Sequence, residues 1–414
     1  MKKPSQAAIL CGGLGSRLRP YTDQMPKPMI PCNGKPFLWY LLHQLAEQGV
    51  NRFVLLTGYL AEQIENYFGN GAEWNWEIQY SVGPVEWDTG KRIWEAREQL
   101  DDPFILLYAD NYASYSLDKV FEHHETNARP LTFMVAQKSP GNIALDEVGN
   151  VKIYDNDRSN LELIYVEIGY MIVNKDQTLN FFERPDCSFS SVLRVMAAEQ
   201  GISAWIQRDS YHSISDPERW RKAEQYLKSK KIIFIDRDGV INKRPPKGQY
   251  VSKWEEFEWI EETLEAMKVL SVDGFKFIVI SNQAGVARNM VKVADLEKIH
   301  IEMKAKFHET GIDILNIYVC PHHWDDNCDC RKPKPGMFHQ ASREWLVMLS
   351  KTLFIGDDPR DCQAAYNAGC KSVFVGEHAE LNDLSDKEQP MNVSANLCDA
   401  LPAIRDFFRE NNTL

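Results

Sequence analysis

Short runs of hydrophobic residues alternate with amphipathic segments along the first hundred residues of the chain. Each run has the length of a strand, whereas the hydrophobic positions of the intervening segments recur every three or four residues, as on one face of a helix. The expected strands cover residues 7–13, 52–58 and 103–110, and the expected helices cover residues 36–49, 60–68 and 91–100. Strands that alternate with helices predict a mainly parallel sheet with helices on both faces.

The same alternation starts again in the second half of the chain. Between the two series lies a part richer in short strands, with one arm of a hairpin expected at 148–155 and a strand at 163–173. The second series has strands expected at residues 232–236, 275–282, 314–320, 352–358 and 371–376, and helices at 263–274, 294–311 and 395–408. The new strand after the basic sequence KSKK predicts a boundary near Lys230, and therefore two Rossmann-like α/β domains at residues 1–228 and 231–414.

The composition limits the kinds of partner. A formal net charge of -12 argues against binding along a nucleic-acid backbone, which needs a basic face. The apolar runs are far shorter than the roughly 20 residues that a membrane helix needs, and the basic start is not followed by a signal-peptide core. We therefore expect a cytoplasmic protein that binds small molecules, with neither nucleic acid nor a membrane as partner. The sequence predicts no particular oligomeric state.

A loop rich in glycine and basic residues, CGGLGSRLRPYTDQMPKPM, follows the first expected strand. Its glycines, Gly12, Gly13 and Gly15, allow backbone N–H groups to approach a phosphate chain closely. Arg17 and Lys27 add fixed positive charge. The loop lacks the Gly-Lys-Ser/Thr ending of a P-loop and the third glycine of a dinucleotide fingerprint. A simple glycine-rich turn would explain the glycines but not the cations around the two prolines.

This loop resembles the signature of the sugar-1-phosphate nucleotidylyltransferases, and the similarity extends through about residue 225. The resemblance implies a nucleotidyltransferase (GT-A-like) fold that joins an NTP to a sugar 1-phosphate and releases pyrophosphate. It implies that Arg17 neutralises the triphosphate, that Lys27 grips the phosphates and that Asp110 binds Mg²⁺, although a carboxylate at a strand end can also be only a helix cap. The further residues implied are Thr89 and Gly90 in WDTGK beside the nucleotide, and Glu167 and Gly169 in YVEIGYM at the sugar.

The chain departs from this family at two places. The sequence KIYDNDRSN stands where many members have Glu-Lys-Pro before the sugar-binding strand. Ser213 stands where members usually have a second metal-binding aspartate, and Asp216 follows three positions later. The second metal carboxylate is therefore left unassigned.

Two aspartates, Asp236 and Asp238, lie at the end of the strand expected at 232–236. Alternate residues of a strand share a face, so both carboxylates can point into a cleft at the sheet edge. One can attack phosphorus while the other protonates the leaving oxygen and later activates water. An acidic turn in solvent has the same spacing, but later strands end in donors suited to phosphate: Ser281 and Asn282, with Lys332 further on.

This ordered set, completed by Asp357 in LFIGDD, resembles the haloacid dehalogenase (HAD) phosphatases over residues 231 to about 376. The resemblance implies a HAD-like fold, with Asp236 as the nucleophile and Asp238 as the general acid and base. It implies a Mg²⁺ ion held by Asp236, Asp238 and Asp357. Only about 44 residues separate Asp238 from Asn282, so we expect a minimal cap rather than a cap domain.

Three cysteines and two histidines gather in the sequence CPHHWDDNCDCRKPKPGM. Together with FIDRDGVIN and SNQAGVAR, this loop resembles the heptose 1,7-bisphosphate phosphatases and the histidinol phosphatases, in which it binds structural zinc. The spacing offers one closed tetrahedral set of ligands, with His323 as an alternative. Arg331 and Lys332 follow directly and would face a bound phosphate. The expected zinc ligands are Cys320, His322, Cys328 and Cys330, and the other six cysteines are expected to be reduced and buried.

The two resemblances imply neighbouring reactions. The second domain would remove one phosphate from a sugar bisphosphate, heptose 1,7-bisphosphate in the first hypothesis, and the first domain would join the 1-phosphate to a nucleotide from GTP. A second hypothesis keeps both chemistries but uses another sugar or polyol phosphate with CTP or another NTP. A third hypothesis makes one half a degenerate binding or regulatory module. The first half is the candidate, because Ser213 stands there in place of a metal-binding aspartate.

Overall fold

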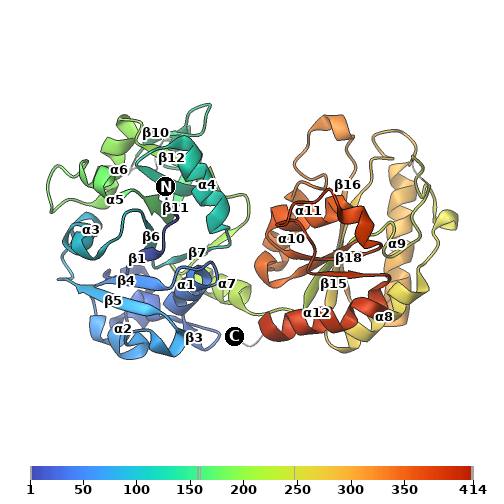
Figure 1. The fold of residues 1–414 in the computed structure, drawn as a ribbon, viewed down its shortest axis with the longest axis horizontal. Coiled ribbons are helices and arrows are strands. Elements are labelled where there is room, and N and C mark those ends of the chain that lie inside the picture. The colour runs from blue at the N-terminus through green and yellow to red at the C-terminus, as the bar shows by residue number, and fades with distance from the viewer. Residues whose placement is uncertain (1, 156–157, 159, 247, 412–414) are drawn as a thin grey trace. The chain divides into compact units, whose positions relative to one another are not determined.

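The chain divides between Leu227 and Lys228 into two units, which are described separately (Figure 1). The structure, a computed structural model, describes residues 2–155, 158, 160–246 and 248–411. Within those ranges no helix has both the length and the apolar character needed to cross a bilayer.

Four parallel strands form one side of the sheet in the first unit, in the order β5-β4-β1-β6. They are β1 (Gln6–Leu10), β4 (Arg52–Thr57), β5 (Glu77–Val82) and β6 (Phe104–Tyr108). Helices connect them: α1 (Phe37–Ala46), α2 (Ala61–Phe68) and α3 (Thr89–Ala96). Because the strands are parallel, the loops that follow them meet at one edge of the sheet, which is where a ligand site is expected.

The other side of this sheet contains both parallel and antiparallel pairs. β11 (Tyr165–Val173) runs antiparallel to both β6 and β8 (Leu131–Gln137), whereas β12 (Ile202–Ile206) pairs with β8 in parallel. The predicted hairpin arm is confirmed as β10 (Val151–Tyr154), which pairs with β9 (Ile143–Leu145). The α/β prediction is confirmed, but the sheet is mixed because β11 runs antiparallel to β6, β8 and β9, and β9 and β10 form a hairpin, whose short connection cannot join parallel strands.

The remaining elements of the first unit lie around this sheet. The short strands are β2 (Pro31–Cys32), β3 (Lys35–Pro36), β7 (Asn111–Ala113) and β13 (Tyr211–Ser213), and the helices are α4 (Leu117–Asn127), α5 (Lys175–Leu179), α6 (Phe189–Ala198) and α7 (Pro217–Leu227). β13 pairs with β7 directly after Asp110, which brings the end of the unit back to the edge where β6 ends.

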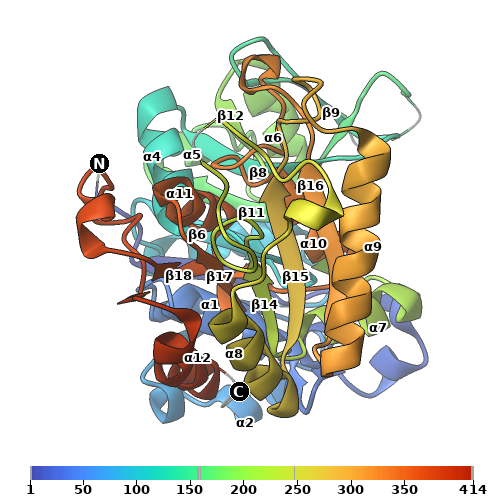
Figure 2. The ribbon, with the colours of Figure 1, turned by 90° about the vertical axis from the view of Figure 1, so that its right-hand side faces the viewer.

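The second unit contains a six-stranded parallel sheet in the order β16-β15-β14-β17-β18-β19. Figure 2 shows its central strands β14 and β15 side by side. The strands are β14 (Ile232–Ile235), β15 (Lys276–Asn282), β16 (Ile314–Cys320), β17 (Leu353–Gly356), β18 (Lys371–Val375) and β19 (Asn392–Ser394).

Helices cover both faces of this sheet. Ile233 and Ile235 belong to one buried cluster with α8, α9 and α12, whereas Ile232 and Phe234 belong to another with α10, as the two-residue period of a strand requires. The helices are α8 (Glu261–Val272), α9 (Val293–Thr310), α10 (Gly336–Trp345), α11 (Pro359–Ala368) and α12 (Leu397–Asn411). The described residues between β14 and α8 form loops with one short 3-10 helix, Trp254–Glu256, so the expected minimal cap is confirmed.

Candidate functional sites

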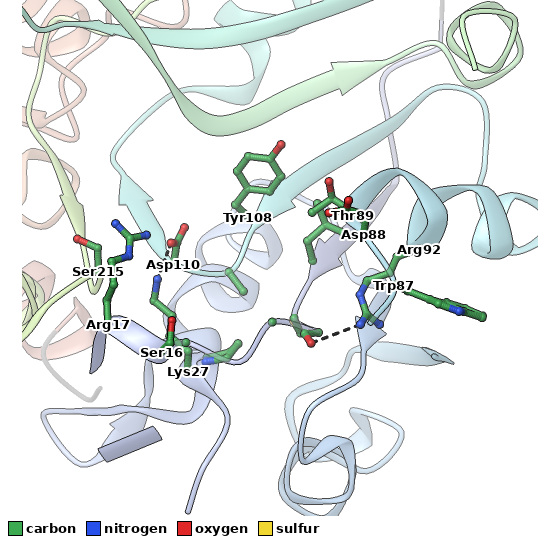
Figure 3. Close-up of a pocket in the computed structure, with 17 residues that line it drawn as sticks. Ser16, Arg17, Lys27, Trp87, Asp88, Thr89, Arg92, Tyr108, Asp110 and Ser215 are labelled. Carbon is green, nitrogen blue, oxygen red and sulfur yellow. Dashed lines mark hydrogen bonds and ion pairs between the residues drawn. The ribbon is translucent and has the colours of Figure 1, made fainter. Parts of the chain in front are cut away.

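A cavity of about 430 Å³ lies at the carboxyl ends of β1 and β6 in the first unit (Figure 3). Its wall combines the glycine loop, the start of α3 and the end of β6. The predicted residues that line it are Gly12, Gly13, Gly15, Arg17, Lys27, Thr89 and Asp110. Gly90, Glu167 and Gly169 lie outside this lining. The structure therefore brings together seven residues that are up to 98 positions apart in the chain, counting from Gly12 to Asp110.

Lys27 and Asp110 form an ion pair across the cavity wall, with 2.6 Å between Lys27 Nζ and Asp110 Oδ2. Mg²⁺ needs several oxygen ligands in an octahedral arrangement. Among the described residues, Asp110 does not belong to any group of three or more potential metal ligands. A divalent cation here would therefore take most of its oxygens from a substrate, and we assign no chemical step to one.

The place of the expected second aspartate is occupied by a hydroxyl. Ser213 ends β13, and its Oγ lies 3.2 Å from Oγ of Ser215, which lines the cavity. Asp216 instead starts α7, where its carboxylate accepts a hydrogen bond from the N–H of Arg219 at 3.0 Å. That bond lowers the pKa of Asp216. Asp216 is thus a helix cap.

Thr89 and Gly90 are the first residues of helix α3 and contact the segment that contains Cys187 and Phe189. Thr89 Oγ1 accepts a hydrogen bond from the N–H of Phe189 at 3.1 Å. A Cβ on Gly90 would lie 2.4 Å from the carbonyl oxygen of Cys187. The two residues therefore fix the start of the helix beside the cavity.

Glu167 and Gly169 lie on β11, next to the end of β6. A Cβ on Gly169 would lie 2.9 Å from the side chain of Tyr108, which lines the cavity. Burial and the nearby charge of Asp110 raise the pKa of Glu167 to about 8. A protonated carboxyl can donate a hydrogen bond to a sugar hydroxyl, which is compatible with the predicted contact. The contact between Glu167 and the sugar stays a prediction.

The sequence motifs did not include Arg92, which also lines the cavity (Figure 3). Its side chain is buried, and its guanidinium donates to the carbonyl oxygens of Thr57 at 2.6 Å and Pro84 at 2.7 Å. The only sequence signal was an arginine on the helical face that also carries buried Ile93 and Ala96.

In the second unit, Lys332 lies between two buried carboxylates at the carboxyl edge of the sheet. Its Nζ is 2.9 Å from Asp236 Oδ1 and 2.8 Å from Asp361 Oδ1, and it also donates to the carbonyl oxygen of Ile280 at 3.1 Å. All three charged side chains are almost fully buried. The predicted nucleophile and the predicted phosphate-binding lysine are therefore in direct contact.

Asp236, Asp357 and Asp361 form a group whose carboxylate oxygens lie within 4.8 Å of one another. Burial, Asp361 and Asp357 raise the pKa of Asp236, against the opposing charge of Lys332. Oδ1 of Asp357 is buried without a hydrogen-bond partner among the described residues, and its Oδ2 pairs with Arg244 at 2.8 Å. A set of carboxylate oxygens with one atom unsatisfied fits Mg²⁺, which prefers such ligands.

Gly239 allows this group to form. Its φ is +98°, and a Cβ there would lie 1.6 Å from Oδ2 of Asp357. Any other residue would therefore displace Asp357 or the loop after Asp238.

Asp238 has a different environment from Asp236. Its carboxylate accepts hydrogen bonds from Arg237 at 2.8 Å, Gln283 at 2.7 Å and Asn242 at 3.0 Å. Burial opposes its ionisation, but the charge of Arg237 and these bonds lower its pKa. Asp238 was expected to bind Mg²⁺ with Asp236 and Asp357, but its carboxylate does not belong to the group of possible metal ligands. The third member of that group is Asp361.

Asn282 holds the backbone of Lys332 rather than pointing freely into the site. Its Nδ2 donates to the carbonyl oxygen of Lys332 at 3.1 Å, and its Oδ1 accepts from the N–H of Lys332 at 3.0 Å. Ser281 Oγ accepts from Gln283 at 2.8 Å, and Nη1 of Arg331 is buried without a partner among the described residues. Phosphate binding by Ser281, Asn282 and Arg331 stays a prediction.

The four predicted zinc ligands form a compact cluster. Sγ of Cys320 lies 3.6 Å from Nδ1 of His322 and 3.6 Å from Sγ of Cys328, while Sγ of Cys330 lies 3.2 Å from His322 and 3.5 Å from Cys328. Four donors at these separations fit the corners of a tetrahedron around one ion, because Zn–S bonds are about 2.3 Å long. His323 is engaged elsewhere: its Nδ1 accepts from the N–H of Asp325 at 3.3 Å.

Two known families match separate parts of the chain. Residues 6–153 match the nucleotidyl transferase family, and residues 329–400 match the HAD-hydrolase-like family. The protein is thus a nucleotidyl transferase domain followed by a HAD-type domain. A D-glycero-beta-D-manno-heptose-1,7-bisphosphate 7-phosphatase from Pseudomonas aeruginosa is 39% identical over 147 residues, which are 36% of this chain and 82% of the relative. The chain belongs to the family of the heptose-1,7-bisphosphate 7-phosphatases.

Two solved structures are similar to parts of the chain. The D,D-heptose 1.7-bisphosphate phosphatase of B. bronchiseptica, complexed with magnesium and phosphate, is 31% identical and covers 42% of this chain and 98% of its own, with a TM-score of 0.40. HddC from Yersinia pseudotuberculosis is 24% identical and covers 54% of this chain and 100% of its own, with a TM-score of 0.47. The matched families support transferase and phosphomonoesterase activities on small-molecule substrates.

Proposed function

We propose that the chain is a bifunctional enzyme of sugar-nucleotide synthesis that acts in the cytoplasm, with domains at residues 1–228 and 231–414. The second domain removes the 7-phosphate from a heptose 1,7-bisphosphate, and the first transfers a guanylyl group from GTP to the heptose 1-phosphate that remains. The observation that carries the proposal is the contact of Lys332 with Asp236 and Asp361, in a chain that also holds a nucleotidyl transferase domain.

The phosphatase reaction uses in turn the two aspartates that follow β14, Asp236 and Asp238. A carboxylate oxygen of Asp236 bonds to phosphorus, and the bond from phosphorus to the sugar oxygen breaks. Asp238 is ionised in the free site, so it gives that oxygen a proton only after it has taken one up from water when the anionic substrate binds. Asp238 then takes a proton from the water that attacks the aspartyl phosphate and releases inorganic phosphate. Mg²⁺ held by Asp236, Asp357 and Asp361 would screen the negative charge between nucleophile and substrate. Lys332 adds a fixed positive charge beside the attacking oxygen.

The transferase reaction depends on position and charge. An oxygen of the sugar 1-phosphate attacks the α-phosphorus of the NTP, and the bond to the β-phosphate breaks to release pyrophosphate. Arg17 and Lys27, on the wall of the cavity, hold the phosphates in line and balance their charge. No residue needs to form a covalent bond with the substrate.

Purified protein is expected to hold about one zinc ion per chain, in the cluster that includes Cys328. We expect Cys328→Ser to lose most of this zinc and to lower phosphate release about tenfold or more, because Cys330 directly precedes the loop that carries Lys332. Metal analysis and a phosphate assay on the same preparation measure both effects. Cys398→Ser, outside the cluster, is the matched control. Full zinc content in Cys328→Ser would contradict the ligand set.

The substrates are tested by a matrix of four NTPs against a panel of sugar and polyol 1-phosphates, with pyrophosphate release as the readout. The proposal expects the fastest release with GTP and a heptose 1-phosphate, and the two anomers are assayed separately. A maximum with CTP or with another sugar would keep the chemistry and change the substrates. No pyrophosphate with any pair would eliminate the transferase assignment.

A second candidate, favoured by Ser213 at the place of a metal-binding aspartate, makes the first unit a nucleotide-binding regulatory module. This candidate predicts that the wild-type protein binds an NTP without turnover and that the bound NTP changes the rate of phosphate release. The bifunctional enzyme predicts turnover.

A further inference from the structure

Arg92 joins the loops that follow three neighbouring strands at the edge where the cavity lies. Its Nη1 donates to the carbonyl oxygens of Thr57 at 2.6 Å and Gly83 at 3.5 Å. Its Nη2 donates to those of Pro84 at 2.7 Å and Gly12 at 3.4 Å. Thr57 ends β4, whereas the loops with Gly12 and Gly83 follow β1 and β5. One guanidinium therefore sets the relative positions of three backbone segments.

The space for this guanidinium exists because two neighbours have no side chain. A Cβ on Gly12 would lie 2.3 Å from Cζ of Arg92, and a Cβ on Gly58 would lie 2.6 Å from Nη2. Both separations are far shorter than contacts between nonbonded atoms. Gly12 belongs to the glycine loop that faces the cavity, so the position of Arg92 and the shape of that loop are coupled.

The positive charge of Arg92 has no carboxylate partner among the described residues, since no ion pair joins it to an acidic group there. The residue is 4% exposed. Burial lowers the pKa of the guanidinium, but arginine stays protonated at neutral pH. A buried charge is costly unless an opposite charge balances it. The cavity that Arg92 lines is where a ligand could supply that charge.

We infer that Arg92 is a positioning residue for the nucleoside triphosphate, and this inference rests on the proposed transferase function of the first unit. The four carbonyl groups already occupy both terminal nitrogens of Arg92, so the residue acts through the loops it holds and through its charge. It fixes the glycine loop in the conformation that receives the phosphates. Its charge favours a triphosphate over an uncharged nucleoside in the same cavity.

The test compares the binding of an NTP with that of its nucleoside by titration calorimetry on the full chain. The NTP used is the one that the wild-type protein binds most tightly of the four. Arg92→Met is expected to weaken NTP binding by about thirtyfold and nucleoside binding by less than about threefold, because only the triphosphate responds to the lost charge. Arg92→Lys, which keeps the charge but not the four hydrogen bonds, is expected to fall between Arg92→Met and the wild type.

Arg97→Met is the matched control, since Arg97 bonds to the carbonyl oxygen of Trp94 at 2.7 Å and does not line this cavity. Thermal unfolding of each full-length variant, followed by circular dichroism, reports whether the first unit is folded, because activity of the second unit reports only on that unit. If Arg92→Met does not fold, Gly58→Ala provides a second route, because the added Cβ displaces the guanidinium while the arginine remains in the chain, and Gly58 does not line the cavity. It should also weaken NTP binding more than nucleoside binding.

The outcomes separate two kinds of failure. A wild-type protein that binds no NTP contradicts the proposed function itself. A wild-type protein that binds an NTP, with Arg92 variants that bind it equally well or lose NTP and nucleoside affinity in equal measure, overturns the role of Arg92. In steady-state assays the inference expects KM for the NTP to rise by a similar factor, with kcat within about threefold of wild type.

Discussion

Asp236→Asn is expected to lower phosphate release from a sugar bisphosphate by about a thousandfold or more, while pyrophosphate formation stays within about twofold of wild type. An amide oxygen is a poor nucleophile toward phosphorus, but asparagine keeps the shape of the side chain. Lys332 retains its partner Asp361 at 2.8 Å, so the loop should keep its place. Both products are measured on the same preparation of the full chain.

Asp313→Asn is the control for that experiment. Asp313 belongs to the second unit and forms a half-exposed ion pair with Lys276 at 2.8 Å, and such pairs contribute little to stability. We expect both activities to survive this change. Undiminished phosphate release in Asp236→Asn would remove Asp236 from the role of nucleophile. Loss of both activities would show that the two units do not work independently.

Lys27→Met is expected to have the opposite effect, lowering pyrophosphate formation by about a hundredfold to a thousandfold and leaving phosphate release unchanged. Methionine keeps much of the alkyl chain that packs beside Gly15 but has no charge to hold the triphosphate. The variant also frees Asp110 from its ion pair at 2.6 Å. The measurement is the initial rate of pyrophosphate release at saturating sugar phosphate.

Lys3→Met is the matched control for Lys27→Met. Lys3 also pairs with an aspartate of the first unit, Asp118, at 2.5 Å, but that pair is exposed and lies outside the cavity. Its loss should leave both rates within about twofold of wild type. A Lys27→Met protein that forms pyrophosphate at the wild-type rate would mean that Lys27 serves Asp110 and not the substrate.

Much of the fold could be predicted from hydrophobic spacing because the central strands of both sheets are largely buried runs of four to seven residues. The run at 232–236 and the buried strand β14 (Ile232–Ile235) are one example. The helical spacing at 395–408 likewise predicted α12, which packs Leu397, Ile404 and Phe408 into the core of the second unit. The antiparallel direction of β11 could not be predicted, because strand direction depends on the connections and leaves no mark in the hydrophobic pattern.

The candidate sites were predictable where chemistry is concentrated in a short motif. The four residues of the cysteine loop lie within eleven positions, and the structure groups the same four. Arg244 and Arg92 could not be found in this way. Each acts on groups that come from distant parts of the chain: Arg244 pairs with Asp357, and Arg92 binds carbonyl groups from three loops. Asn282 was expected to bind phosphate, but which partner its amide holds depends on a loop 50 residues away.

Arg92, Gly12 and Gly58 also limit how this chain can change over evolutionary time. While the arginine is present, an alanine at position 12 or 58 would collide with its guanidinium, so this part of the cost of either mutation depends on the arginine. Once a smaller residue replaces Arg92, the collision no longer opposes an alanine at either glycine position. Each alanine then makes a return to arginine more costly. The order in which mutations occur at positions 12, 58 and 92 therefore decides which of them are tolerated. Loss of the arginine becomes harder to reverse with each alanine that follows it.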